Sequence, residues 1–120
     1  MAKPKQQKYS IKFKKGDMLQ CLIGTEKHWG IYIGYNRIVH AVRCTEHCKG
    51  GSKININKIQ DVGEPETFEV DNSRDSTFNY PYSPDRVVER ALVQIGTKTS
   101  RNSLQFAKYC RYGSGTREWV

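Results

Sequence analysis

The segment HWGIYIGYNRIVH, residues 28–40, decides the fold because it has the strongest pattern for paired β-strands in the chain. Trp29, Ile31 and Ile33 alternate with glycine and tyrosine, which is the period of a half-buried strand. Residues 38–42 supply a return strand, and the glycine and asparagine near position 35 favour a turn. The segment predicts a β-hairpin that carries His28 and His40, two of the three histidines.

The length of the turn decides which faces the two histidines occupy. A two-residue turn at 35–36 would place them on opposite faces, because a shift of one residue exchanges the faces of a strand. A three-residue loop at 34–36 would pair Ile33 with Arg37 and place the second histidine opposite Gly30. We favour the longer loop, since it gathers the large apolar residues of both strands on one core face. It also leaves Gly30 bare on the histidine face, with room for a ligand.

The other segments predict further strands and then two helices. Strands are expected at 18–23, 53–57 and 67–70 from their apolar alternation. The first helix is expected to begin at Ser83-Pro84, since serine is a good N-cap and proline suits the first helical position. Its apolar stripe runs to Ile95, before a glycine stop. Strands followed by helices predict an α+β fold with a mostly antiparallel sheet.

A second helix is expected after Asn102. The Asn102 side chain can cap this helix, and Gln105 three residues later completes a capping box. Ser103 then lies in the first helical turn, where free backbone N–H groups and the positive end of the helix dipole gather. Because that environment stabilises a developing oxyanion, Ser103 is a candidate reactive residue.

Length and charge limit the function classes. The chain has 120 residues, enough for one domain with a buried core, and a formal net charge of +8. This charge indicates an anionic partner such as a membrane surface, an anionic substrate or nucleic acid. No apolar run approaches the ~20 residues that span a bilayer, so we expect no transmembrane anchor.

The cysteines indicate a reduced setting and no metal. We expect Cys21, Cys44, Cys48 and Cys110 to be free thiols, since no signal peptide is visible. Cys44 and Cys48 lack a second ligand pair at zinc-finger spacing, and the 43–52 segment is typical of an exposed loop. We therefore expect neither a metal nor a cofactor.

Motifs in a fixed order resemble those of the lecithin:retinol acyltransferase-like family. They are Gly16-Asp17, the segment 28–34, Val39-His40, the segment 102–106 and the segment 110–113. The nearest branch is that of the small phospholipase A and acyltransferase proteins. The resemblance divides the chain into a basic N-terminal tail at 1–12, the family domain at 13–113 and a short C-terminal tail at 114–120.

The resemblance implies a fold, a reaction and a site. The fold is a permuted papain-like (NlpC-type) α+β fold, with an antiparallel sheet of about four to six strands packed against helices. The reaction moves an acyl chain from a glycerophospholipid, through a covalent acyl-enzyme, to water, an amine or another lipid. His28 would be the general base, His40 would orient it and stabilise its charged form, and Ser103 holds the nucleophile position. The residues expected to line the site are Trp29, Gly30, Tyr32 and Asn102.

The nucleophile position departs from the family motif. The family has Asn-Cys-Glu-His-Phe, whereas this chain has Asn102-Ser103-Leu104-Gln105-Phe106. A thiol with an ordinary pKa of about 8.5 ionises at a helix N-terminus much more readily than a serine hydroxyl. Serine therefore needs full base assistance and a well-formed oxyanion hole, and we expect slow chemistry.

Two further functions stay open at this point. One is a catalytically inactive family member that binds a lipid or a protein in the cleft where active relatives bind their substrate. The other follows picornaviral relatives named for an H-box and an Asn-Cys motif, whose layout is similar and which bind RNA or host factors. RNA is the less favoured partner, because no aromatic-rich RNA-binding signature accompanies the basic residues. We expect a cytoplasmic monomer that touches anionic membranes peripherally.

Overall fold

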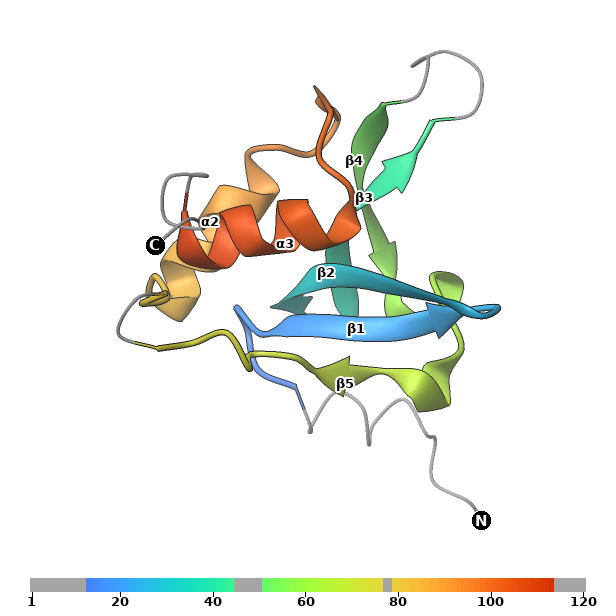
Figure 1. The fold of residues 1–120 in the computed structure, drawn as a ribbon, viewed down its shortest axis with the longest axis horizontal. Helices are drawn as coiled ribbons and strands as arrows, with labels where there is room; N and C mark the ends of the chain where they lie inside the picture. The colour runs from blue at the N-terminus through green and yellow to red at the C-terminus, as the bar shows by residue number, and fades with distance from the viewer. Residues whose placement is uncertain (1–12, 45–50, 77–78, 114–120) are drawn as a thin grey trace.

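The computed structural model describes residues 13–44, 51–76 and 79–113, which form an antiparallel sheet with two α-helices on one face (Figure 1). The sheet has six strands in the order β5-β1-β2-β3-β4-β6. The strands are β1 Met18–Ile23, β2 Glu26–Gly34, β3 Arg37–Arg43, β4 Ser52–Lys58, β5 Glu69–Val70 and β6 Lys98–Thr99. The helices are α2 Pro84–Leu92 and α3 Ser103–Tyr112, with 3-10 turns η1 Ile59–Asp61 and η2 Pro65–Thr67. The predicted α+β class is confirmed, while the predicted tails and most of the 43–52 loop lie outside the described residues.

The β2–β3 hairpin has the predicted register but a different turn. Tyr35 and Asn36 both adopt positive φ, at 54° and 63°, and form a two-residue turn with Gly34 opposite Arg37. The predicted three-residue loop and the pairing of Ile33 with Arg37 are therefore wrong. A bulge at Ile33 inserts the residue that the longer loop would have supplied, so the strands pair beyond it as predicted.

Each face of the sheet has its own core. The predicted core face of the hairpin is confirmed, since Ile31, Val39 and Ala41 are buried against α2 and α3 with Trp29 and Ile33 packed beside them. The helices contribute the buried residues Val87, Ala91, Phe106, Ala107, Cys110 and Tyr112. On the opposite face lies a second cluster, formed by Phe13, Leu19, Cys21, Tyr32, Ile38, Ile59 and Phe68.

Helix α2 begins as predicted and ends early. The backbone N–H of Arg86 donates to the side-chain oxygen of Ser83, the N-cap. The helix ends at Leu92, and the chain then turns as far as Gly96, whose φ is 90°. The predicted apolar stripe is wrong at its C-terminal end, because Leu92 and Ile95 are 41% and 37% exposed.

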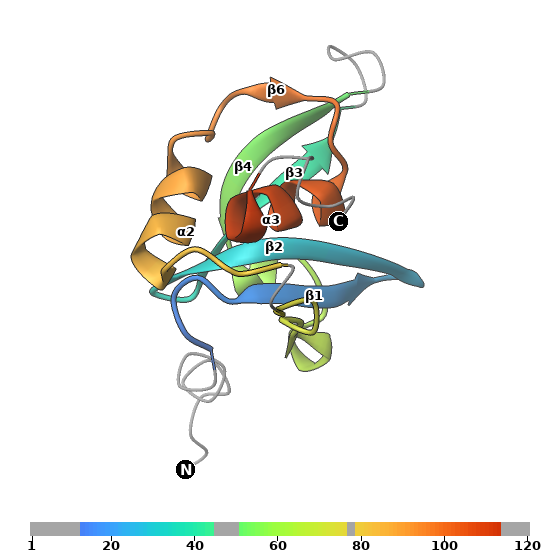
Figure 2. The same ribbon diagram turned by 60° about the vertical axis from the view of Figure 1, so that its left-hand side comes forward.

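Two short strands differ from the sequence prediction. β6 lies between the two predicted helices, where no strand was expected, and pairs with the start of β4, where Thr99 is opposite Ser52 (Figure 2). This pairing holds the segment that leads into α3 against the sheet. β5 is shorter than the predicted strand at 67–70, with Phe68 buried and Val70 40% exposed.

Two of the cysteine predictions are confirmed and one is wrong. Cys21 and Cys110 are free and buried. Cys44 is disulfide-bonded, so it is not the free thiol that the sequence predicted.

Within the part of the chain that the structure describes, no helix is both long and apolar enough to cross a lipid bilayer.

Candidate active site

β2 and β3 separate at one end of the hairpin, and α3 begins in the fork between them. Their pairing runs from Ile31 opposite Val39 to the turn, which leaves the residues before Ile31 and after Val39 without mutual pairing. Both views show β2 and β3 diverging around the start of α3 (Figures 1 and 2). Three of the predicted site residues, His28 on β2, His40 on β3 and Ser103 on α3, meet at this fork.

A cavity of about 550 Å³ occupies this region. Its walls come from β2, the C-terminal end of β3, the N-terminal end of β4, and the segment 100–104, which includes the first residues of α3. His28, Trp29, Asn102 and Ser103 all line it. The cavity therefore brings together residues that are about 75 positions apart in the sequence.

Ser103 is the first residue of α3, held there by the predicted capping box. The Gln105 N–H donates to the Asn102 side-chain oxygen at 2.8 Å, and the Asn102 N–H donates to Gln105 Oε1 at 2.9 Å. The first N–H groups of a helix have no partner within the helix and point toward its N-terminal end. The Ser103 hydroxyl thus lies beside free backbone donors.

The Ser103 oxygen also contacts β2 directly. The backbone N–H of Trp29 donates to Ser103 Oγ at 3.2 Å. This N–H belongs to the peptide bond that follows His28, so serine and histidine are neighbours across the fork. Among the described residues, no hydrogen bond joins the His28 ring to Ser103.

The two histidines form a hydrogen-bonded pair. His28 Nε2 lies 2.7 Å from His40 Nδ1, with the rings at an interplanar angle of 89°. His40 is 4% exposed, whereas His28 is half-buried and faces the cavity. The geometry places His40 behind His28, on the side of the His28 ring that carries Nε2.

Asn57 on β4 extends this chain of hydrogen bonds and was not anticipated from the sequence. Its side-chain oxygen lies 2.9 Å from His40 Nε2. An oxygen acceptor at Nε2 requires the proton there, so Nδ1 of His40 accepts from Nε2–H of His28. The network thus assigns the proton positions and leaves Nδ1 of His28 as the unprotonated nitrogen. No motif marks Asn57, and only the alternation of β4 places it near the histidines.

Both imidazoles are neutral at neutral pH. Burial, and then the charge of His40, lower the pKa of His28 to about 4. Burial also lowers the pKa of His40, although its hydrogen bond to Asn57 opposes this shift. A neutral His28 has a free lone pair, which is the state that a general base requires.

Trp29 is anchored from the far side by Asp71. Its indole N–H donates to Asp71 Oδ2 at 2.9 Å, and the same carboxylate accepts from Ser73 and Arg74. Burial opposes ionisation of Asp71, but these three hydrogen bonds outweigh it and lower the pKa of the carboxyl. Trp29, which lines the cavity, is therefore held by an ionised carboxylate that accepts three side-chain hydrogen bonds.

Two of the residues expected to line the site lie elsewhere. A Cβ on Gly30 would come within 2.6 Å of two atoms of the Ile38 side chain, so this glycine makes room for Ile38 and not for a ligand. Tyr32 is buried in the second core cluster, where its hydroxyl accepts from the Asn36 N–H at 3.0 Å. Neither residue lines the cavity. Across the described ranges, no three His, Cys, Asp or Glu side chains form a potential metal site.

Comparison of the sequence with known families identifies the family of this chain. The family described as "Lecithin retinol acyltransferase" matches residues 11–116, and the chain belongs to this family. Human phospholipase A and acyltransferase 3 is 26% identical over 89% of this chain and 75% of its own length. Human phospholipase A and acyltransferase 4 is 26% identical over 83% of this chain and 70% of its own length. Human phospholipase A and acyltransferase 2 is 23% identical over 88% of this chain and 74% of its own length.

Proposed function

We propose that this cavity is an acyl-transfer site for glycerophospholipids, which acts as a phospholipase A and as an acyltransferase. The observation that carries the proposal is the shared cavity, which His28 and Ser103 line from different elements while His40 and Asn57 support His28 from behind. The family and the names of the relatives support the same chemistry. The net charge of +8 suits an anionic membrane surface as the source of the substrate.

In the first half-reaction, Nδ1 of His28 takes the proton of the Ser103 hydroxyl as Oγ attacks an ester carbonyl carbon of the lipid. The carbonyl oxygen becomes an oxyanion, and the N–H groups at the start of α3 are the donors placed to stabilise it. When the intermediate collapses, the proton on His28 passes to the leaving glyceryl oxygen. The products are a lysophospholipid and an acyl ester on Ser103.

The second half-reaction reverses these roles. His28 takes a proton from water, an amine or a lipid hydroxyl, which attacks the acyl ester and releases the Ser103 hydroxyl. His40 keeps Nε2 of His28 bonded throughout and shares the positive charge that His28 carries in the transition state. The neutral Asn57 offers less stabilisation of that charge than a carboxylate would, so we expect slow turnover by serine.

We also propose that the fold is the permuted papain-like (NlpC-type) arrangement. The histidines lie on strands that precede the nucleophile helix in this chain, and α3 packs on the same face of the sheet as α2. Superposition of an experimental structure on a papain-like enzyme, with α3 and the histidine strands as anchors, tests this assignment.

The first test compares the hydrolysis of a fluorogenic phosphatidylcholine by the parent chain and by its Ser103→Cys, His28→Ala and Ser100→Cys variants. Ser100 lines the same cavity but precedes α3, so a thiol there lacks the helix N-terminus. We expect Ser103→Cys to raise the rate at least about tenfold, because the helix dipole favours a thiolate. We expect Ser100→Cys to leave the rate unchanged and His28→Ala to abolish it. Equal rates for the two cysteine variants would refute Ser103 as the nucleophile position.

A second candidate function is a binding protein that retains the cleft without turnover. It is favoured by one contact: Ser103 Oγ accepts from the Trp29 N–H, and no hydrogen bond to the His28 ring is present among the described residues. In this case the parent chain and the Ser103→Cys variant are both inert toward phosphatidylcholine, and yet the chain binds the lipid.

A further inference from the structure

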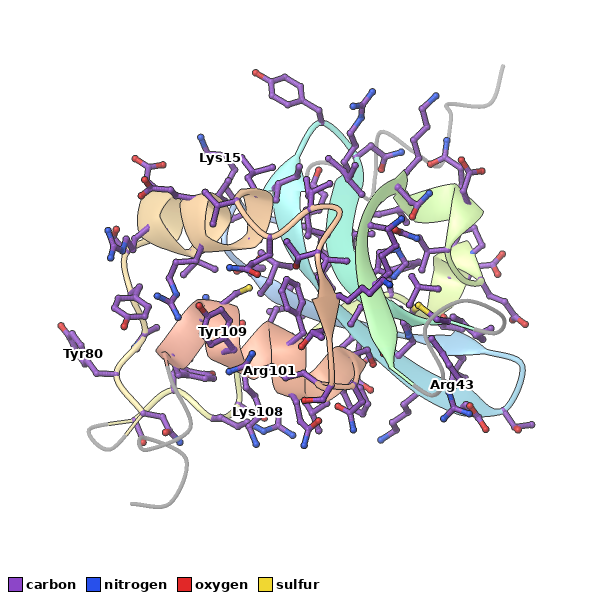
Figure 3. All side chains as sticks on the ribbon, turned by 90° about the horizontal axis from the view of Figure 1, so that it is seen from above. Lys15, Arg43, Tyr80, Arg101, Lys108 and Tyr109 are labelled. Carbon is purple, nitrogen blue, oxygen red and sulfur yellow. The ribbon has the colours of Figure 1, made fainter. Side chains whose placement is uncertain are left out.

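Arginine and tyrosine side chains alternate in a ladder across α2 and α3. The guanidinium carbon of Arg101 lies 4.2 Å from the centre of the Tyr109 ring, and that of Arg90 lies 4.4 Å from the same centre. Arg90 also lies 4.6 Å from the centre of the Tyr82 ring, and Arg86 lies 5.8 Å from it. Figure 3 shows Tyr109 and Arg101 next to each other on α3, beside α2. Because rings hold guanidinium groups by the face of their plane, the ladder orders the arginines and leaves donors at their edges.

The ladder carries more positive charge than its neighbours neutralise. Among the described residues, no carboxylate forms an ion pair with Arg90 or Arg101. Arg86 pairs with Glu89 at 3.8 Å, but both side chains are more than half exposed, and such a pair is weak in water. Lys108, which Figure 3 shows beside Arg101, adds another cation. The ladder therefore presents a cationic surface to an anionic partner.

Exposed apolar side chains continue this surface where α2 ends. Val93 lines a hollow of about 210 Å³ together with Tyr109 and two arginines of the ladder. It is 66% exposed, and its neighbours Leu92 and Ile95 are 41% and 37% exposed. The N–H of Ile95 donates to the Leu92 carbonyl at 3.2 Å, which closes the turn 92–95. Cationic and apolar surfaces therefore meet at this turn.

The ladder begins where the wall of the candidate active site ends. The segment 100–104 lines the cavity, and Arg101 within that segment contacts the Tyr109 ring further along α3. The tip of the β1–β2 hairpin, by contrast, lies on the opposite side of the molecule from α2 in both views (Figures 1 and 2). A partner that covers the ladder thus lies close to the cavity and away from this tip.

We propose that this α2–α3 face binds the surface of an anionic lipid bilayer, with its arginines at the lipid phosphates and its apolar turn among the acyl chains. The residues of the face come from both helices and their flanks: Tyr82, Arg86, Arg90, the turn 92–95, Arg101 and Tyr109. Basic, tyrosine and apolar side chains next to one another are typical of surfaces that lie in a membrane interface. A nucleic acid would account for the arginines but not for the exposed apolar turn. Each tyrosine ring also already carries two guanidinium groups where bases would stack.

The experiment measures co-sedimentation of the chain with vesicles that contain about one phosphatidylserine to three phosphatidylcholine molecules. A Ser103→Ala background is used, so that no turnover alters the lipid. Arg86→Gln and Arg101→Gln remove one charge each from the ladder, and Val93→Asn removes the most exposed side chain of the apolar turn. The basic residues before position 13 are the same in every variant, so their attraction to the vesicles cancels in the comparison.

The matched controls lie at the tip of the β1–β2 hairpin. Lys27→Gln removes an exposed cation there, and Ile23→Asn removes an apolar side chain that is 45% exposed. These two residues have the same exposure and chemistry as the ladder and the turn, but no arginine–tyrosine ladder lies beside them. Thermal unfolding of each variant confirms that it is folded.

We expect Arg86→Gln and Arg101→Gln each to weaken vesicle binding by about fivefold, which is the usual contribution of one cation at an anionic membrane surface. Val93→Asn should also weaken binding by about fivefold, because it removes an apolar group that the bilayer would bury. Lys27→Gln and Ile23→Asn should change the affinity by less than about twofold, since salt screens charges far from the bilayer. Vesicles of phosphatidylcholine alone should bind the parent at least about tenfold more weakly.

Equal losses of affinity in the α2–α3 variants and in the hairpin controls would overturn the proposal, because they would show only the general attraction of a basic chain. The proposal also fails if the arginine variants lose affinity for single-stranded oligouridylate but not for vesicles, which would assign the ladder to a nucleic acid. Hydrolysis of a short-chain phosphatidylcholine below its micellar concentration tests the proposed reaction without a bilayer. Failure of the membrane surface and failure of the reaction are therefore distinguishable.

Discussion

Replacing Asn57 with leucine should change the tautomer of His40. The Asn57 oxygen lies 2.9 Å from His40 Nε2, and His40 is 4% exposed, so water does not readily replace this acceptor. Without it, the Nε2–H tautomer buries an unpaired donor. The Nδ1–H tautomer instead donates to His28 Nε2, which then forces the remaining proton of His28 onto Nδ1. The nitrogen proposed to accept the proton of Ser103 is thereby blocked.

The size of the effect follows from one buried hydrogen bond. Its net contribution is about 1 kcal/mol, which corresponds to roughly a fivefold shift in the tautomer ratio. We expect a similar loss in kcat of the Ser103→Cys enzyme with little change in KM, since substrate binding does not involve Asn57. Stability to urea should fall by about 1–2 kcal/mol. Asn57→Asp keeps an acceptor, so it should preserve the tautomer, and its charge should move the acid limb of the pH–rate profile to higher pH.

The assay is long-range 1H–15N spectroscopy of the histidine side chains, which reports the protonated nitrogen of each ring without any need for turnover. The matched control is Asn55→Leu. Asn55 lies directly across from His40 in the β3–β4 register, yet no hydrogen bond joins its side chain to a described residue. In the Asn57→Leu variant, His40 could still carry its proton on Nε2 and none on Nδ1, as in the Asn55→Leu control. That result would show that the proposed chain of hydrogen bonds does not set the tautomer.

Protonation of His28, crowding at Gly30 and loss of the Asp75 carboxylate give three more predictions. Because the pKa of His28 falls from 6.5 to about 4 on folding, the folded chain binds fewer protons than the unfolded chain between these values. The free energy of unfolding should therefore decrease by roughly 1–2 kcal/mol as pH falls through this window, and urea unfolding of the parent and His28→Gln checks whether the decrease depends on this ring. Gly30→Ala should destabilise by about 1–3 kcal/mol because of the 2.6 Å approach to Ile38, and an equal cost in an Ile38→Ala background would contradict this cause. Asp75→Ala removes the carboxylate partner of the 11% exposed Arg111 side chain, which keeps only its hydrogen bond to the Gly16 carbonyl among the described residues, and should cost about 3 kcal/mol in thermal or urea unfolding. A loss below about 0.5 kcal/mol would argue against the pair.

The sequence was sufficient wherever local chemistry decides the structure. β1 has the predicted bounds 18–23, since its apolar run is closed by a glycine. The start of α3 follows from the capping box, because the side chains of Asn102 and Gln105 each accept a hydrogen bond from the other residue's backbone N–H. These two bonds need no contact from the rest of the fold. Local patterns of this kind placed Ser103 at a helix N-terminus before any contact was known.

The hairpin turn shows where local reasoning fails. The sequence left two turns open, and the shared apolar face favoured the three-residue loop over the two-residue turn that Tyr35 and Asn36 form. The burial of Ile31, Val39 and Ala41 on one face requires a fixed register, and the bulge at Ile33 reconciles that register with the short turn. The hydrophobic pattern thus predicted the pairing correctly while the loop was wrong.

The sequence alone therefore determined the four longer strands β1 to β4, the helix starts, the family motifs and the pair of histidines. Only the tertiary structure placed Asn57 behind His40, showed that Gly30 makes room for the Ile38 side chain, and brought His28 and Ser103 to one cavity. The physical reason is distance along the chain. A cap or a strand period is set by residues a few positions apart, whereas these contacts depend on how β3, β4 and α3 pack around the fork.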